Sequence, residues 1–524
     1  MVDRRHRSTW FDMAAPSRVG WYLCENDLQM YYDLPIPNTN IEKQMGNMLP
    51  DKEIPLCVDL DGTLIRSDVL MESFLLLIKL RPWMIFVIPF WLLRGRAALK
   101  YEIAHRVDLD AKTLPYQENL IGFLKDERTK GRTLILATAA HRKIAEGIAE
   151  HLGIFTVVLA TADGINLVGR VKRDALVERY GERGFDYAGN SRADLHVWAM
   201  ARQAIVVNPR KGVLQGATVC CPVSHTFKDE QPHWSMYTKA VRAHQWLKNL
   251  LVFVPMLMAH RMTGIHLWAD VLLAFISFSL CASSVYLFND LFDLPADRLH
   301  PRKHKRPFAS GDLSIIQGLL LTPVLLLAAF AIAISWLPLA FSLVLAAYYA
   351  LTVSYSLWLK SVVILDAVIL AGLYTLRIIG GAAAIGIGAS FWLLAFSIFL
   401  FFSLALVKRY SELLALRQRG QLTTHGRGYH VEDLVMLMGF GVASGFLAVL
   451  VSAFYVNSTK VQALYMHPTV LWPVSPILLY WISRIWLITH RGGMHDDPVV
   501  FAATDKGSWV VAAIIAGLLW CAAV

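Results

Sequence analysis

Apolar runs long enough to cross a lipid bilayer fill the second half of this 524-residue chain and constrain its fold more than any other feature. A membrane-spanning helix needs about 20 predominantly apolar residues, because each residue advances the helix by about 1.5 Å. About nine segments meet this requirement, and the first is the shortest. They lie at about 246–260, 266–288, 315–335, 337–354, 362–385, 390–407, 433–456, 469–488 and 508–524. We therefore expect residues 246–524 to form an all-α polytopic membrane domain.

Lys and Arg are unevenly distributed over the loops between these segments. The loops after the second, fourth, sixth and eighth segments are basic, whereas the alternate loops carry only Arg261 and Lys460. Basic loops are retained on the cytoplasmic side of a membrane. This bias predicts an integral protein of the cytoplasmic membrane with its amino-terminal domain inside and its carboxyl terminus outside. It also accounts for the net charge of +10, so we expect membrane lipids, and no nucleic acid, as partners.

The residues before the first apolar segment carry most of the charge and divide into three regions. We expect a mobile extension at 1–51, a soluble domain at 52–225 and a linker at 226–245. Apolar runs rich in β-branched residues alternate with helical patterns through the soluble domain, which predicts an α/β Rossmann-like fold with a parallel sheet. The predicted strands are 54–59, 133–138, 156–161, 186–189 and 204–208, and the clearest helical patterns are 141–152 and 173–181.

Polar residues follow these predicted strands where the carboxyl ends of a parallel sheet would meet. Together they suffice for the hydrolysis of a phosphate ester. One carboxylate would attack phosphorus, a second would protonate the leaving oxygen, a hydroxyl and a lysine would hold the phosphoryl group, and acidic groups would bind Mg²⁺. The candidates are Asp59, Asp61, Thr138, Lys172, Asn190 and Asp194.

Four features of this domain resemble the four motifs of the haloacid dehalogenase phosphatase superfamily. They are Asp59-Leu60-Asp61-Gly62-Thr63, a threonine at a strand end, a lysine, and Gly189-Asn190-Ser191-Arg192-Ala193-Asp194. The resemblance implies that Asp59 is the nucleophile and Asp61 the general acid and base, and that Thr138 and Lys172 bind phosphate. It places Asp59, Asp61 and Asp194 around Mg²⁺. Many members have aspartate where this chain has Asn190, which offers an oxygen but no charge. A domain kept for regulation or assembly is therefore the alternative.

The superfamily places a helical cap between its first two motifs, here at about 66–130. This insertion contains an apolar stretch from Trp83 to Leu93, with Pro89 inside it and Arg81, Arg94 and Arg96 beside it. The stretch is too short to span a bilayer. It could lie in the membrane interface, or it could be a buried pair of cap helices.

A second acidic motif ends the second apolar segment. Asp290, Asp293 and Asp297 are spaced to share one face of a helix, and Pro295 predicts a break before Asp297. Dense carboxylates beside basic residues form a site for Mg²⁺ and a diphosphate. The neighbouring candidates for substrate binding are Asn289, Arg298, Lys303 and Arg306.

More polar residues lie on the same predicted side of the membrane. Asp366 and Arg377 enter the fifth segment, where ionisable groups are functional candidates, although the two could instead form a structural ion pair. The sequence also has His495-Asp496-Asp497-Pro498 before the ninth segment. The remaining candidates are Lys248, Tyr355, Lys360, Lys408, Arg409 and Glu412.

The motif Asn289-Asp290-Leu291-Phe292-Asp293 with Asp297-Arg298 resembles that of the UbiA superfamily of intramembrane prenyltransferases. Most of that superfamily has a second acidic cluster, where this chain has Tyr355, Lys360 and Asp366. The replacement of the second acidic cluster looks like the branch typified by decaprenyl-phosphate phosphoribosyltransferase. The same branch is indicated by the pattern from Arg242 to Asn249 and by Lys408-Arg409-Tyr410-Ser411-Glu412.

That resemblance implies phosphoribosyl pyrophosphate as donor, polyprenyl phosphate as acceptor and at least one Mg²⁺ per site. Asp290, Asp293, Asp297 and Asp366 would be catalytic. The fused phosphatase would remove the 5-phosphate from the lipid-linked product. The alternatives are a prenyltransferase acting on an aromatic acceptor, or a transporter or scaffold without turnover. By family analogy the chain could form a homo-oligomer.

Overall fold

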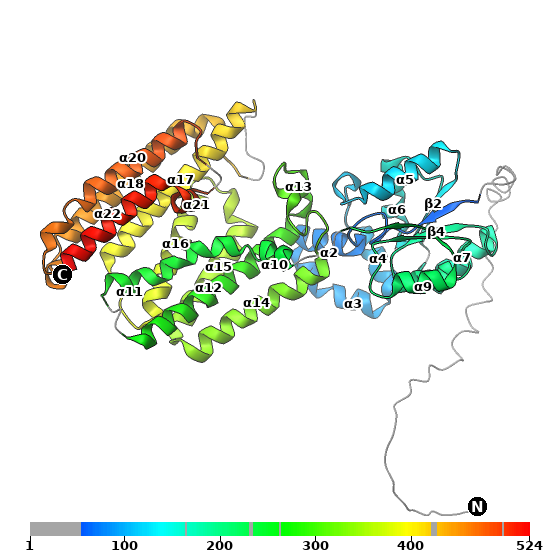
Figure 1. Cartoon of the computed structure of the whole chain (residues 1–524), viewed down its shortest axis with the longest axis horizontal. Coiled ribbons are helices and arrows are strands. Elements are labelled where there is room, and N and C mark those ends of the chain that lie inside the picture. Colours follow the sequence, from blue (N-terminus) through cyan, green and yellow to red (C-terminus); the bar gives the residue numbers. More distant parts are fainter. Residues whose placement is uncertain are drawn as a thin grey trace, which may run out of the picture. The chain divides into compact units, whose positions relative to one another are not determined.

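The computed structural model describes residues 54–162, 165–229, 234–260, 264–420, 427–494 and 497–523. The extension expected at 1–51 lies outside these residues. From Ile54 onwards the chain forms one compact unit, in which a domain with a central sheet precedes a helical domain (Figure 1).

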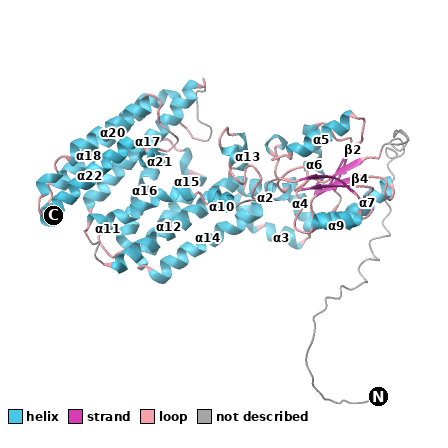
Figure 2. Cartoon of the chain, in the orientation of Figure 1, coloured by secondary structure: helices cyan, strands magenta, loops and turns pink. Residues whose placement is uncertain are grey.

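A six-stranded parallel sheet forms the centre of the first domain (Figure 2). Its strands stand in the order β3-β2-β1-β4-β5-β6, which confirms the predicted α/β fold. The edge strand β6 was missed because its side chains are largely exposed and carry no apolar run. The strands are β1 (Leu56–Val58), β2 (Leu134–His141), β3 (Val157–Thr161), β4 (Asp186–Gly189), β5 (Ala204–Val207) and β6 (Val223–Phe227).

Helices cover both faces of the sheet (Figure 1). Leu56 and Val58 belong to the apolar core under one set of helices, and Cys57 between them belongs to the core under the other. Burial on both faces explains why the strands read as continuous apolar runs. The first set is α5 (Glu118–Thr129) and α6 (Arg142–Leu152), and the second is α7 (Arg170–Tyr180), α8 (Leu195–Trp198) and α9 (Val213–Cys220).

The insertion after β1 is helical, as expected of a cap. The cap ends earlier than the predicted range of about 66–130, because α5 packs on the sheet and so belongs to the core. Asp68 begins the cap by accepting hydrogen bonds from the amides of Leu70 and Met71. The cap elements are α2 (Val69–Leu80), η3 (Pro82–Phe86), α3 (Ile88–Leu93), α4 (Arg96–Ala104) and η4 (Ala111–Thr113).

Eight helices of the described chain are long and apolar enough to cross a membrane. They coincide with the second to ninth predicted segments. The short α10 (Trp234–Ala240) precedes them, and short elements such as α21 (Pro498–Thr504) connect them. The eight are α12 (Ile265–Phe292), α14 (Ile315–Trp336), α15 (Leu339–Leu357), α16 (Leu365–Ala384), α17 (Phe391–Gln418), α18 (Leu434–Val456), α20 (Val474–His490) and α22 (Lys506–Ala523).

The first predicted span differs from the others, because it is a 3-10 helix, η6 (Ala243–Phe253), followed by the short α11 (Val254–Met258). A 3-10 helix rises about 2 Å per residue, so the two elements together reach about 30 Å, which matches the hydrocarbon core of a bilayer. The segment runs antiparallel to α12, since Trp246 bonds to Ser283 and Phe253 contacts Trp268. It therefore covers the length of a span with fewer residues than an α-helix needs.

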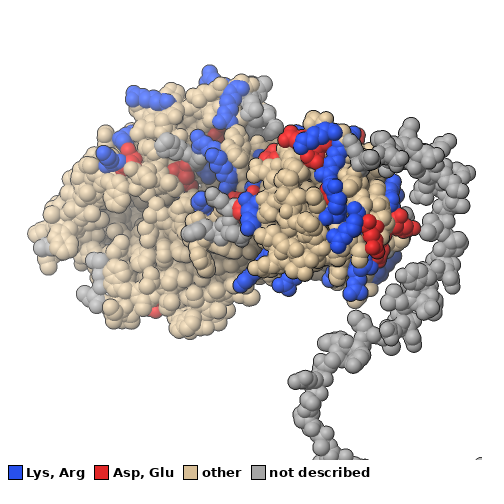
Figure 3. Space-filling model, turned by 45° about the vertical axis from the view of Figure 1, so that its right-hand side comes forward, with Lys and Arg blue, Asp and Glu red and all other residues tan. Residues whose placement is uncertain are grey.

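Charged side chains are dense over the sheet domain and sparse over most of the helical domain on the face shown in Figure 3. Many large apolar side chains of the spanning helices are exposed, among them Leu327 in α14 and Val435 in α18. Such a surface suits contact with lipid rather than water.

Candidate active sites

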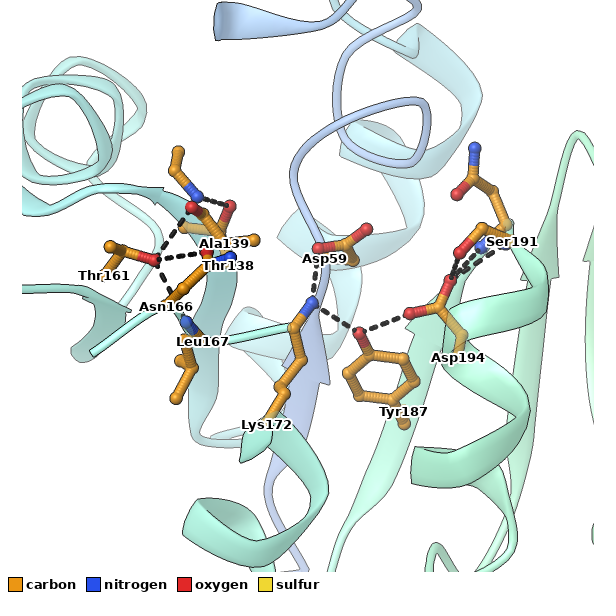
Figure 4. A network of polar contacts seen from close by, with 12 residues as sticks. Asp59, Thr138, Ala139, Thr161, Asn166, Leu167, Lys172, Tyr187, Ser191 and Asp194 are labelled. Atoms are coloured by element: carbon orange, nitrogen blue, oxygen red, sulfur yellow. Dashed lines mark hydrogen bonds and ion pairs between the residues drawn. The ribbon is translucent and has the colours of Figure 1, made fainter. Parts of the chain in front are cut away.

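The first candidate site lies at the carboxyl ends of β1, β2 and β4, where the sequence predicted it. Lys172 of α7 donates a hydrogen bond of 2.7 Å from Nζ to Asp59 and one of 3.0 Å to the hydroxyl of Tyr187. That hydroxyl donates in turn to Asp194 at 2.9 Å (Figure 4). A chain of polar contacts therefore joins the first, third and fourth predicted motifs. Tyr187 was not predicted, because an aromatic residue inside a strand carries no sequence signal of this role.

Asn190 is held by the backbone and by a close contact with a glycine. The backbone amides of Asn190 and Ser191 donate hydrogen bonds to the carboxylate of Asp194 at 3.1 and 2.8 Å. Gly62, directly after Asp61, has φ +74°, and a Cβ there would lie 2.1 Å from Nδ2 of Asn190. Glycine is therefore required at position 62 both by its backbone conformation and by the space that Asn190 occupies.

Asp61 and Thr138 complete the set of predicted phosphatase residues. Oδ1 of Asp61 accepts a hydrogen bond of 2.8 Å from the amide of Val69, at the start of the cap helix α2. The hydroxyl of Thr138 is fully buried and accepts from the amide of Ala140 at 3.0 Å. The start of the cap is thus tied to one of the two carboxylates of the first motif.

Burial sets the protonation states of this site. It raises the pKa of Asp59 to about 6, while Lys172 acts in the opposite direction. Burial, Asp68 and Asp59 raise the pKa of Asp61 well above its ordinary value. The two shifts suit a carboxylate that attacks as a nucleophile at Asp59 and a carboxyl group that gives up a proton as a general acid at Asp61.

A cap lysine also reaches the edge of this site. Nζ of Lys100 in α4 donates to the carbonyl oxygen of Ala139 at 2.6 Å and to Oδ1 of Asn166 at 2.9 Å. Ala139 directly follows Thr138, so Lys100 connects the cap to the strand that carries the predicted phosphate-binding threonine. A lysine on a cap helix resembles many surface lysines in sequence, which is why it was not predicted.

In the second candidate site, the acidic motif is divided by a break between two helices. Helix α12 ends at Phe292 and α13 (Leu294–Leu299) begins directly after Asp293. The predicted break before Asp297 is confirmed and falls at Asp293, because Pro295 lies in the first turn of the new helix, where its missing amide costs nothing. Asp290 and Asp297 therefore face one group of cations and Asp293 another.

Arg306 connects Asp290 and Asp297, which are both buried. Its Nη1 lies 3.0 Å from Asp290 and also pairs with Asp297. Arg242 pairs with Asp290 as well. Arg306 was predicted here; Arg242 stood in a motif of the sequence but was not assigned to the site.

Asp293 pairs with two lysines, one from each domain. It lies 3.0 Å from Lys79 at the end of α2 and 3.7 Å from Lys360 in η8 (Leu359–Ser361). Burial raises its pKa, but Lys360 and Lys79 hold the pKa of Asp293 below its ordinary value. Lys360 was predicted at this site, whereas Lys79 was not.

The other residues predicted around the motif have different positions. Arg298 points away from the carboxylates, since it forms a buried ion pair at 2.6 Å with Glu72 of α2 and donates to the carbonyl of Thr113. Lys303 lies in η7 (Lys303–Lys305), where burial lowers its pKa and Asp297 opposes that shift. Asn289 is half-buried beside Asp290.

A group of polar residues surrounds the amino end of η6. Lys248 pairs with Asp497, and its Nζ lies 6.0 Å from the centre of the Tyr374 ring. Burial raises the pKa of Asp497, but Lys248 and Lys408 hold it below its ordinary value. Lys248 and Lys408 were predicted to bind substrate and do lie together. His495 and Asp496, from the same sequence motif as Asp497, fall outside the described residues.

Asp366 belongs to a buried network at the start of α16. It lies 2.5 Å from Arg409 and accepts a hydrogen bond of the same length from the hydroxyl of Tyr429. Arg409 also contacts Glu412 at 2.7 Å and the hydroxyl of Tyr355 at 3.1 Å. Four predicted residues thus meet in one network.

The structural pair between Asp366 and Arg377 does not form, because about three helical turns, or roughly 16 Å, separate them along α16. Arg377 instead donates to Oδ1 of Asn249 at 2.7 Å and to the hydroxyl of Tyr348 at 2.9 Å. Both partners are uncharged side chains of other elements.

No group of three or more His, Cys, Asp or Glu side chains in the described part of the chain is arranged to hold a metal ion. Mg²⁺ is commonly held by one or two carboxylates, with substrate phosphate oxygens completing its shell. Asp290 and Asp297 both contact a single nitrogen of Arg306, so their oxygens converge on one point. That pair fits a hard cation brought in with a phosphate substrate.

The folds and sites define a membrane-embedded transferase domain joined to an α/β domain with a parallel sheet. A family model described as the UbiA prenyltransferase family matches residues 250–504, and the chain belongs to that family through its membrane domain.

Three relatives extend the comparison. The chain is 37% identical over 477 residues to the protein y4nM of Sinorhizobium fredii, covering 89% of this chain and 90% of that one. It is 38% identical over 274 residues to the nodulation protein NoeC of Azorhizobium caulinodans, covering 52% of this chain and 89% of that one. It is 38% identical over 186 residues to the decaprenyl-phosphate phosphoribosyltransferase of Mycolicibacterium smegmatis, covering 35% of this chain and 58% of that enzyme.

Proposed function

We propose that this protein is a bifunctional membrane enzyme. Its membrane domain transfers 5-phosphoribose from phosphoribosyl pyrophosphate to a polyprenyl phosphate, and its phosphatase domain then removes the 5-phosphate from the lipid-linked product. The observation that carries the proposal is the convergence of Asp290 and Asp297 on one cation position, in a chain similar to a decaprenyl-phosphate phosphoribosyltransferase.

The acidic motif and its cations suit the pyrophosphate end of the donor. Arg242, Arg306 and Lys360 already balance the buried carboxylates. When a diphosphate binds, these side chains can turn from the carboxylates to the phosphate oxygens and offset the negative charge of the leaving group. The bond between the anomeric carbon and pyrophosphate breaks as the positive charge on the ribose ring grows.

Lys248 and Lys408 suit the phosphate of the acceptor lipid. They lie beside Asp497 near the amino end of η6, within the part of the chain that the apolar surface places in the membrane. A lipid phosphate held there would attack the anomeric carbon through one of its oxygens. The phosphate is already an anion, so this step needs no base.

The donor set also fits Mg²⁺. In the membrane domain Asp290 and Asp297 would hold it, whereas Asp293 pairs with Lys79 and Lys360 and would stand apart from the metal. In the phosphatase domain Asp59 and Asp61 would hold it with the substrate phosphate, and Asp194 and Asn190 would lie nearby, Asn190 contributing at most an uncharged oxygen. Mg²⁺ bound in these places supplies positive charge that stabilises pyrophosphate as a leaving group and the phosphoryl group under attack.

The phosphatase step uses residues that already lie together. Asp59 attacks phosphorus, Lys172 and Thr138 hold the phosphoryl oxygens, and Asp61 gives its proton to the 5-oxygen of ribose as the ester bond breaks. Water then attacks the phosphoaspartate, Asp61 takes a proton from that water, and inorganic phosphate leaves.

The experiment uses purified protein in nanodiscs with Mg²⁺, polyprenyl phosphate and ribose-labelled phosphoribosyl pyrophosphate. Mass analysis of the extracted lipid should find ribose linked to the lipid without a 5-phosphate. A labelled lipid that keeps its 5-phosphate would disprove the phosphatase step alone. Absence of label from the lipid would disprove the transfer.

The alternative function is a prenyl transfer from a prenyl diphosphate to an aromatic acceptor. The family match favours it, but where most of that superfamily has a second acidic cluster this chain has Asp366, which pairs with Arg409 and Tyr429. Incubation with prenyl diphosphate and aromatic acids separates the two functions, because only one of the substrate pairs should give product.

The proposal places the phosphatase domain and the basic loops on the cytoplasmic side, with the carboxyl terminus outside. The charge bias supports this orientation. It requires the η6–α11 segment to cross the membrane in addition to the eight helices that are long and apolar enough to do so. Soluble phosphoribosyl pyrophosphate and both sites would then share one compartment.

A further inference from the structure

The cap of the phosphatase domain carries an apolar face for which no protein partner is present. Trp83, Phe86, Phe90 and Leu93 expose 58%, 76%, 66% and 85% of their surfaces. They come from the adjoining elements η3 and α3 and are spaced by three, four and three residues, which places them on one side of the helical path. We call these four residues the interfacial face.

The opposite side of the same segment is apolar too. Met84 and Trp91 are buried in a cluster with Leu77, Ile78 and Ile103. A helix at a water-facing surface normally buries one apolar side and exposes a polar one. Here the core of the cap is already complete, and the exposed face requires another apolar environment.

The cap adjoins the end of a spanning helix. Nζ of Lys79 donates to the carbonyl oxygen of Phe292 at 2.7 Å and to Asp293 at 3.0 Å. Phe292, the last residue of α12, packs against the buried cluster of the cap. The interfacial face begins four residues after Lys79, so it lies near the level at which α12 leaves the membrane.

The charges around the interfacial face favour lipid over protein as its occupant. Arg81 precedes it, Arg94 and Arg96 follow it, and all three are exposed. Aromatic side chains flanked by arginines suit the boundary between acyl chains and anionic headgroups. Eleven apolar residues cannot cross a bilayer, but they can lie along its surface.

We propose that the interfacial face inserts into the headgroup region of the bilayer and holds the phosphatase site at the membrane surface. The cap is tied to that site, because the amide of Val69 at the start of α2 donates a hydrogen bond to Asp61. The phosphatase can therefore act on a phosphate ester whose lipid remains in the membrane. This consequence rests on the proposed function, whereas the membrane contact does not.

The test of the contact uses the full chain in nanodiscs, with the fluorescent amino acid Anap placed at position 90 or at position 219. Val219, in α9 of the same domain, is 87% exposed and serves as the matched control. Lipids brominated near the headgroup should quench the probe at position 90 and leave the probe at 219 unchanged, while aqueous iodide should do the reverse. Quenching by iodide at position 90, or protection there from both quenchers, would overturn the proposal, since the face would then meet water or protein.

A second test compares substrates. The double variant Phe86→Ser and Phe90→Ser should hydrolyse a lipid-linked phosphomonoester in nanodiscs about tenfold more slowly, because two buried aromatic contacts with lipid are lost. Its hydrolysis of water-soluble p-nitrophenyl phosphate should match that of the unaltered protein and of Val219→Ser. Equal rates on both substrates in all variants would contradict the role of the face in substrate access. Absence of phosphatase activity in the unaltered protein would count against the proposed function, while the quenching result would still decide the contact.

Discussion

The hydroxyl of Tyr187 connects Lys172 to Asp194 in the candidate phosphatase site. It accepts from Lys172 and donates to Asp194. Tyr187→Phe keeps the ring and removes both hydrogen bonds, so we expect about a tenfold loss in the rate of phosphate-ester hydrolysis. The free energy of unfolding should fall by about 1–3 kcal/mol, because two buried polar groups each lose a partner.

The matched control for Tyr187 is Tyr180→Phe in α7, which removes a hydroxyl from a half-buried tyrosine outside the site. Steady-state kinetics and thermal unfolding of both variants measure the difference. If Tyr180→Phe lowered the hydrolysis rate as much as Tyr187→Phe, the network would have no special role.

Asp59 is the residue on which the phosphatase step depends. Asp59→Asn retains the shape of the side chain but removes the attacking charge, so hydrolysis of the lipid-linked 5-phosphate should fall by roughly 1000-fold or more. Transfer of ribose to lipid should continue, and the 5-phosphorylated lipid should accumulate. Lipid mass analysis measures both, and hydrolysis at the unaltered rate would exclude Asp59 as nucleophile.

At the scale of elements, close approach of backbones decides how η6 packs in the membrane domain. A Cβ at Gly381 of α16 would lie 2.0 Å from the carbonyl oxygen of Val252 in η6. Gly381→Ala must therefore push the two elements apart, and we expect a loss of about 1–3 kcal/mol in stability. Ribose transfer should weaken as well, because Arg242 and Lys248 are positioned by the same segment.

Gly372 lies in the same helix and provides the control, because nothing lies within 4 Å of a Cβ built there. Gly372→Ala should stabilise the helix by up to about 1 kcal/mol. Thermal unfolding in detergent compares the two variants, and a similar loss in both would mean that η6 does not pack closely on α16.

The ion pair between Glu72 and Arg298 connects the cap helix α2 to α13. The two side chains are only 3% and 8% exposed. Glu72→Ala leaves a buried guanidinium without its carboxylate, which typically costs about 3–5 kcal/mol. We expect lower thermal stability and reduced transfer, whereas the control Asp108→Ala, whose side chain is 92% exposed beside Lys143, should change stability by less than about 1 kcal/mol. Equal stability of both variants would show that the buried pair contributes little.

At the scale of the whole molecule, the sequence predicted the elements that a regular pattern specifies. The strands through β5 and the eight spanning helices were found because apolar runs have a fixed spacing. Asp59, Lys172 and Asp194 lie together as predicted, because the ends of parallel strands meet at one edge of the sheet. The partners of buried charges were not found. Arg298 pairs with Glu72 and Arg377 with Asn249, and such contacts join residues far apart in the chain whose spacing carries no periodic signal.

The presence of both sites in one molecule raises the question of how the intermediate moves between them. The intermediate remains anchored by its polyprenyl chain, so it can diffuse within the membrane from a transferase site to the phosphatase site of another molecule. Nanodiscs or vesicles that contain both Asp290→Ala and Asp59→Asn should therefore form the dephosphorylated ribosyl lipid, although neither variant forms it alone. Asp290→Ala retains the phosphatase site, and Asp59→Asn retains the transferase site.

Vesicles that each hold only one variant provide the control, because the lipid cannot cross between them. If mixed vesicles yielded only the 5-phosphorylated lipid, the intermediate would have to pass between the two sites of a single chain, and the contacts of Lys79 with Phe292 and Asp293 would mark where the domains meet.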